Sequence, residues 1–130
     1  MTTSAKNAGN QGNAGEEKLL GAAVRALASR KAERPVVLDL RGHDAFTEYF
    51  VICHGTSDRQ VKSLADAVED QVREEAGRKP STEGYARGEW ILLDYGEVVV
   101  HLFLEDAREF YRLEALWGDC PEIDVATLGA

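Results

Sequence analysis

GEWILLDYGEVVVHLF, at Gly88–Phe103, is the segment of this chain with the clearest structural pattern. It holds two runs of apolar, β-branched and aromatic residues, a composition that favours strands. A short segment between the runs suits a tight turn, because Gly96 can adopt a positive φ. A two-residue loop at Tyr95 and Gly96 would place Trp90 opposite His101. The stretch therefore predicts a β-hairpin.

The two faces of this hairpin differ in chemistry, because alternate side chains of a strand point to opposite sides. One face is purely aliphatic and is expected to lie in the core; it holds Ile91, Leu93, Val98, Val100 and Leu102. The other mixes aromatic, aliphatic and polar side chains, which is typical of a recognition surface. Its members are Trp90, Leu92, Asp94, Glu97, Val99, His101 and Phe103.

Helical and strand patterns continue on both sides of the hairpin. The clearest helix begins after Ser57, where Gln60 completes a capping box. The order α-β-β-α-(β)-β-β-α predicts the α/β (α+β) class, with a mixed β-sheet flanked by helices. The expected elements are helix 16–32, strands 36–41 and 48–54, a helix from 58 that ends at Gly77, a weak strand within 81–87, the hairpin, and a helix from Glu105 that carries Phe110, Leu113 and Trp117.

The chain of 130 residues is expected to hold one ordered domain, at 16–121. Residues 1–15 have almost no apolar side chains to bury and are expected to form a disordered N-terminal extension. Residues 122–130 are expected to form a C-terminal tail. The two Cys lack CxxC spacing, no apolar run could span a bilayer, and no targeting peptide is recognisable. These features predict a cytoplasmic protein with reduced thiols and no membrane contact.

Charge narrows the class of partner. Fifteen basic against twenty-three acidic side chains give a net charge of −8. DNA binding requires clustered Lys and Arg to neutralise phosphates, so a role on DNA is not expected. An acidic protein suits a basic protein partner, because complementary charge speeds and orients the encounter.

The spacing of the potential catalytic and metal-binding residues gives little support for an enzyme. The three histidines show no metal-ligand spacing, so neither a metal nor a cofactor is expected. A Gly-Ser-like turn before a helix, here Gly55–Ser57, is typical of nucleotidyltransferases, whose chemistry also needs paired carboxylates on a neighbouring strand. Asp39 is alone on its strand, so no catalytic residue is predicted. A nucleotide-binding or nucleotidyltransferase enzyme using Gly55–Ser57 remains the alternative, and a dimeric interaction module is a third hypothesis.

Four collinear segments resemble the ribosomal silencing factor family, also known as RsfS, Iojap or DUF143. They are VVLDLRG, FTEYFVICHGTSDRQVKSLADAVED, GEWILLDYGEVVVHLF and AREFYRLEALWGD. The resemblance implies a nucleotidyltransferase-like fold that lacks the catalytic carboxylates. It also implies a non-enzymatic protein that binds the large ribosomal subunit through ribosomal protein L-fourteen. Such a protein blocks association of the ribosomal subunits and represses translation when nutrients are limiting.

The resemblance also assigns site residues. The family patterns WxLxDYGxVVxH and REFYxLExLW fall on the hairpin and on the helix after it. Cys53-His54 is a departure, because family members often have a small residue before the GTSDRQ turn. An apolar hairpin edge would be exposed in a monomer and predicts a homodimer as well. The predicted partner-binding residues are Trp90, Leu92, Asp94, Tyr95, Gly96, Val99, His101, Arg108, Glu109 and Tyr111.

Overall fold

A computed structural model describes the backbone of residues 2–129 and the side chains of residues 15–129. In this part of the chain, six strands form one sheet in the order β3-β4-β5-β2-β1-β6. The strands are β1 (Glu33–Asp39), β2 (Tyr49–Gly55), β3 (Ser81–Glu83), β4 (Trp90–Asp94), β5 (Val98–Leu104) and β6 (Glu122–Ile123). The helices are α1 (Thr2–Ser29), α2 (Asp58–Ala76), α3 (Glu105–Tyr111), α4 (Leu113–Leu116) and the 3-10 helix η1 (Val125–Leu128).

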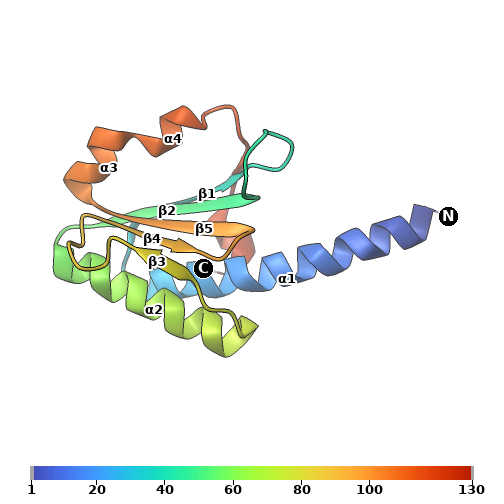
Figure 1. Ribbon diagram of the computed structural model, residues 1–130, viewed down its shortest axis with the longest axis horizontal. Coiled ribbons are helices and arrows are strands. Elements are labelled where there is room, and N and C mark those ends of the chain that lie inside the picture. The colour runs from blue at the N-terminus through green and yellow to red at the C-terminus, as the bar shows by residue number, and fades with distance from the viewer. Residues whose placement is uncertain (1, 130) are drawn as a thin grey trace.

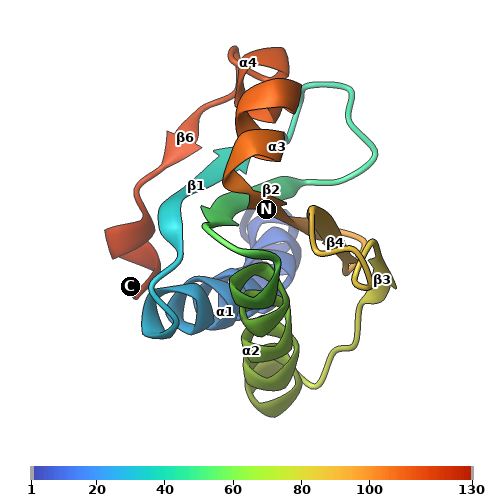
Figure 2. The ribbon, with the colours of Figure 1, turned by 90° about the vertical axis from the view of Figure 1, so that its left-hand side faces the viewer.

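Two layers of helices enclose the sheet. Strands β2 and β5 pair in parallel, and the other neighbouring strands pair antiparallel. A parallel pair needs a long crossover, which here contains α2, β3 and β4. Helices α1 and α2 lie on one face of the sheet, and α3 and α4 lie on the other (Figures 1 and 2). The predicted class, a mixed sheet flanked by helices, is confirmed.

The larger core lies between the sheet and the pair α1–α2. The aliphatic face of the hairpin belongs to it, as predicted, and its five side chains are fully buried: Ile91, Leu93, Val98, Val100 and Leu102. Helix α2 faces this core with a stripe of residues at helical spacing, namely Val61, Leu64, Ala65, Val68 and Val72. Burial of each larger aliphatic side chain contributes about 1.5–3 kcal/mol, so packing holds the helix in place.

The predicted ends of α2 are confirmed. The Ser57 hydroxyl accepts a hydrogen bond from the Gln60 N–H at 3.1 Å. In return, the Gln60 side-chain oxygen accepts the Thr56 N–H at 2.8 Å. At the other end Gly77 has a φ of 66° and donates its N–H to the Arg73 carbonyl at 3.0 Å. Both termini of α2 are thus capped by residues visible in the sequence.

The predicted hairpin register is wrong by two residues. Trp90 pairs with Phe103, and His101 pairs with Leu92. The Tyr95 N–H donates to the Val98 carbonyl at 2.9 Å, so the turn is centred on Gly96 and Glu97, one residue later than predicted. A shift by an even number of residues leaves every side chain on its predicted face. The two-face description of the hairpin therefore holds although the cross-strand partners change.

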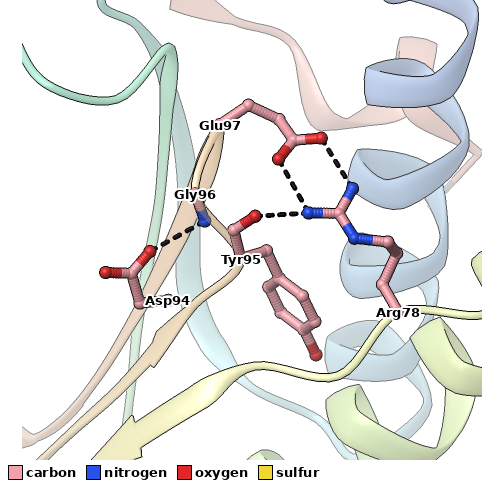
Figure 3. Close-up of polar contacts among 5 residues, drawn as sticks. All are labelled: Arg78, Asp94, Tyr95, Gly96 and Glu97. Atoms are coloured by element: carbon pink, nitrogen blue, oxygen red, sulfur yellow. Dashed lines mark hydrogen bonds and ion pairs between the residues drawn. The ribbon is translucent and has the colours of Figure 1, made fainter.

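Polar contacts hold the turn in this shifted position (Figure 3). The Asp94 carboxylate accepts the Gly96 N–H at 2.8 Å, and Gly96 has a φ of 92°. Arg78, which follows α2, makes two hydrogen bonds to the Glu97 carboxylate, at 2.7 and 2.9 Å, and also donates to the Tyr95 carbonyl. These bonds tie the turn to the segment after α2.

The structure also differs from the prediction at both ends of the chain. Helix α1 runs from Thr2, whereas the helix was expected from Glu16; extending an anchored helix needs no new nucleation. The side chains of residues 1–14 lie outside the described part, so disorder of 1–15 stays a prediction. At the other end β6 pairs with β1, and Val125 and Leu128 pack against the larger core. Among the described helices, none is long and apolar enough to cross a membrane.

Two smaller differences concern strand and helix boundaries. Strand β1 begins at Glu33 and includes Pro35, with an irregularity in register between Glu33 and Val36. Proline is tolerated there because it lies within this irregularity, where neither β2 nor β6 pairs with it. The expected third helix breaks at Arg112, whose φ of 48° separates α3 from α4.

Helix α1 contains one buried carboxyl group, that of Glu16, which lies near charged residues of other elements. Glu16 is only 9% exposed, and its Oε1 atom has no hydrogen-bond partner. Burial, followed by the neighbouring Glu48, raises the pKa of Glu16 to about 7, and Glu97 adds to the shift while Arg41 opposes it. The folded state therefore favours the protonated form of Glu16.

Replacement of Glu16 by Gln should stabilise the protein at pH 8 by about 1–3 kcal/mol and change little at pH 5. The pKa of Glu16 is higher in the folded protein than in the unfolded chain. The wild-type protein therefore loses folding free energy as the pH rises from about 4.5 through 7, where the buried carboxyl group must ionise. Urea unfolding at the two pH values measures the difference, with Glu17→Gln, an exposed neighbour, as the control. An equal effect of Glu16→Gln at both pH values would contradict the assignment.

Candidate partner-binding site

The mixed face of the hairpin is more buried than predicted. Helix α3 follows β5 directly and packs over β5 and β2, which covers the centre of this face. Val99 and His101 are therefore only 2% and 4% exposed. Both belong to the predicted partner-binding set, and neither side chain lies at the surface. The cluster beneath α3 and α4 consists of Leu38, Leu40, Phe50, Ile52, Val99, Phe103, Leu113 and Cys120.

Strand β4 keeps part of the same face open. In the sheet, β4 lies on the far side of β5 from β2, at the margin of the area that α3 covers. The side chains on this face of β4 are therefore half-buried: Trp90, Leu92 and Asp94. The Trp90 ring packs against Tyr111, with centroids 4.8 Å apart, and Tyr111 meets Phe110 edge-on at 5.0 Å. These contacts join β4 to the end of α3. We call Trp90, Leu92, Phe110 and Tyr111 the aromatic surface.

Phe110 is a member of this surface that the sequence prediction missed. It is 79% exposed, and Tyr111 beside it is 49% exposed. The sequence placed Phe110 on one helical face with Leu113 and Trp117. The break at Arg112 separates them, so Leu113 is buried while Phe110 stays outside. A positive φ at an arginine has no clear signature in sequence.

Acidic side chains lie on the same two elements as the aromatic surface, although Glu105 and Glu109 also line a hollow that contains Arg34, Arg108 and Arg112. Asp94 lies on β4, and Glu105, Asp106 and Glu109 are exposed on α3. The helix dipole favours Glu105 and Asp106, because both lie in the first turn of α3. The elements β4 and α3 thus carry both the apolar patch and accessible acidic groups, and such groups suit a basic protein surface.

Tyr95 and Gly96 occupy the hairpin turn rather than the aromatic surface. The Tyr95 ring is 3% exposed and belongs to the larger core, on the opposite face of the sheet. Its hydroxyl has no hydrogen-bond partner, and burial raises the pKa of Tyr95. Gly96 is exposed at the tip (Figure 3). Of this pair, only Gly96 is accessible to a partner.

Arg108 is a structural ion rather than a surface contact. Its side chain is 5% exposed and donates to Glu114 at 2.8 and 3.1 Å and to the Glu33 carbonyl at 3.2 Å. Its Nη1 also lies 2.9 Å from His54 Nδ1. Because a guanidinium only donates, His54 accepts and is neutral, and burial together with Arg108 lowers the pKa of His54. The prediction that Arg108 faces a partner is not supported by its burial.

The family model described as "Ribosomal silencing factor during starvation" matches residues 13–130. This chain belongs to that family. The match extends through β6 and η1, beyond the 16–121 boundary expected from the sequence. The matched residues therefore also cover the segment that was expected to be a tail.

Individual relatives agree with the family assignment. The ribosomal silencing factor RsfS of Bacillus subtilis is 40% identical over 110 residues, which cover 85% of this chain and 93% of that protein. The mitochondrial Iojap-related protein of Arabidopsis thaliana is 34% identical over 110 residues, covering 81% of this chain and 59% of that one. A crystal structure of a Chromobacterium violaceum protein has a TM-score of 0.74 and 36% identity, covering 77% of this chain and 83% of that one.

The nucleotidyltransferase-like turn of this silencing factor is internally bonded. The Thr56 N–H and the Ser57 hydroxyl are both engaged with Gln60 in the cap of α2. Asp39, the acid on the neighbouring strand, accepts two side-chain bonds from Arg41, at 3.0 and 2.8 Å, which lower its pKa. Across the described residues, no group of three or more His, Cys, Asp and Glu is arranged to hold a metal ion.

Glu114→Ala should destabilise the silencing factor by about 3 kcal/mol, because it leaves Arg108 buried without a counter-ion. Glu109→Ala is the matched control: Glu109 is an exposed acid on α3, and its loss should change stability by less than about 0.5 kcal/mol. Urea unfolding of both variants measures the difference. Equal stability of the two variants would show that Arg108 does not depend on Glu114.

Proposed function

We propose that this silencing factor binds the large ribosomal subunit through ribosomal protein L-fourteen and thereby blocks association of the subunits. Translation would be repressed by steric exclusion, with no catalytic step. The observation that carries the proposal is the aromatic surface, where Trp90 and Tyr111 present contiguous apolar area beside exposed Phe110. Large aromatic anchors at the centre of a patch commonly dominate binding energy.

Charge supports a basic protein as the partner. The elements that carry the aromatic surface also hold accessible acidic side chains, and the whole chain has a net charge of −8. Negative charge of this kind favours rapid encounter with a basic protein and disfavours direct contact with RNA phosphates. Binding should therefore weaken as the salt concentration rises.

The alternative, a nucleotide-binding enzyme, has weaker support. A phosphate cradle at Gly55–Ser57 would need backbone N–H groups and hydroxyls that point at a ligand. The internal bonds of Thr56 and Ser57 would have to break first. The pairing of Asp39 with Arg41 also offers no carboxylate pair for two metal ions.

Trp90→Ala should weaken binding to purified large subunits by about 30-fold or more, the equivalent of about 2 kcal/mol. Asp94→Asn should weaken it less, because Asn keeps an oxygen acceptor for the Gly96 N–H and removes only the charge. Co-sedimentation with large subunits at two salt concentrations measures both effects. Homodimerisation through the same surface also remains a prediction. The molecular mass of each variant, measured by light scattering, tests it.

Two controls separate binding from folding. Tyr85→Ala removes a partly exposed aromatic ring that bonds to Asp66 on α2, away from the aromatic surface, and should bind normally. Leu93→Ala in the larger core should cost about 2–5 kcal/mol of stability and retain binding in the folded fraction. Normal binding by folded Trp90→Ala would show that the surface is wrongly assigned.

A further inference from the structure

Trp90 is held from inside the fold by a histidine. Its indole N–H donates to His101 Nδ1 at 3.1 Å. Because His101 pairs with Leu92 in the ladder, the bond runs diagonally across β4 and β5. The Trp90 ring also packs against Phe103 and Tyr111, with both centroid distances 4.8 Å. One hydrogen bond and two ring contacts thus hold the indole of Trp90 in place.

The protonation of His101 follows from this bond. An indole N–H can only donate, so Nδ1 accepts and the ring proton lies on Nε2. Burial lowers the pKa of His101 to about 4, opposed by Asp94, so the ring is neutral near neutral pH. The acceptor at Nδ1 is therefore present under physiological conditions.

Packing alone does not explain a histidine at position 101, because its other ring nitrogen, Nε2, is buried without a partner. His101 is 4% exposed, and Nε2 is buried with no hydrogen-bond partner. Its ring lies against Phe50, with centroids 4.5 Å apart, in the apolar cluster under α3 and α4. A buried N–H without an acceptor destabilises a fold, and an aliphatic side chain would avoid that cost. The one bond that only an acceptor can supply here is the bond to Trp90.

We propose that His101 is the positioning residue of the aromatic surface, holding the Trp90 indole in the orientation that a partner protein meets. This inference rests on the proposed function in one respect, that Trp90 contacts the partner. With its N–H satisfied inside the fold, the indole presents only carbon atoms outward, and the partner needs no acceptor there. A ring fixed before binding loses less conformational entropy in the complex.

The test uses Trp90 fluorescence in a Trp117→Phe background, where Trp90 is the sole tryptophan. His101→Leu removes the acceptor and fills the apolar site. We expect a fast component in the anisotropy decay of Trp90 and binding to large subunits at least about tenfold weaker, with melting temperature unchanged or raised. His101→Asn can place an amide oxygen near the Nδ1 position and should restore slow anisotropy and most of the affinity.

Ile52→Val is the control for general loss of packing, because Ile52 pairs with His101 on β2 and lies in the same cluster. It should lower the melting temperature and leave Trp90 anisotropy and binding unchanged. Unchanged anisotropy in His101→Leu would overturn the inference, as would a loss of stability and order that His101→Asn fails to rescue. Normal subunit binding by Trp90→Ala would instead overturn the proposed function, and the anisotropy of the isolated protein would still decide the role of His101.

Discussion

The parallel pairing of β2 with β5 is the constraint on which the rest of the structure depends. The crossover between them sends α2 to one face of the sheet, and α3 returns over the other face directly after β5. Both central strands are consequently covered on two sides, and all seven residues of β2 are buried. This explains the nearly continuous apolar runs YFVIC and VVV, since a strand buried on both faces has no polar side.

Because these strands are buried on both faces, the two histidines within them must find hydrogen-bond partners inside the protein. His54 accepts a bond from Arg108, and His101 accepts one from Trp90, so each remains neutral and meets a donor that comes from outside its own strand. The donors differ in consequence. Arg108 fastens α3 to the start of β1 and the end of β2, whereas Trp90 extends toward the surface and contacts Tyr111, which in turn contacts Phe110. The interior of the sheet thus determines how the candidate site is presented.

Much of this architecture follows from local patterns. Alternation gave the correct faces of the hairpin, and Ser57, Gln60 and Gly77 marked both ends of α2 correctly, because these features depend on residues close in sequence. Alternation does not reveal what covers a face. The burial of Val99, His101 and Arg108 depends on the path of α3, which no local pattern encodes. The exposure of Phe110 depends likewise on one backbone angle at Arg112.

Contact between the aromatic surface and a basic protein of the large ribosomal subunit can be tested by photo-crosslinking. Benzoylphenylalanine replaces Phe110 in one preparation and Tyr85 in another, and each is incubated with ribosomal subunits. We expect a crosslink from position 110 to ribosomal protein L-fourteen, identified by mass spectrometry, and none from position 85. Crosslinks from position 85 alone, or from position 110 to the small subunit, would contradict it.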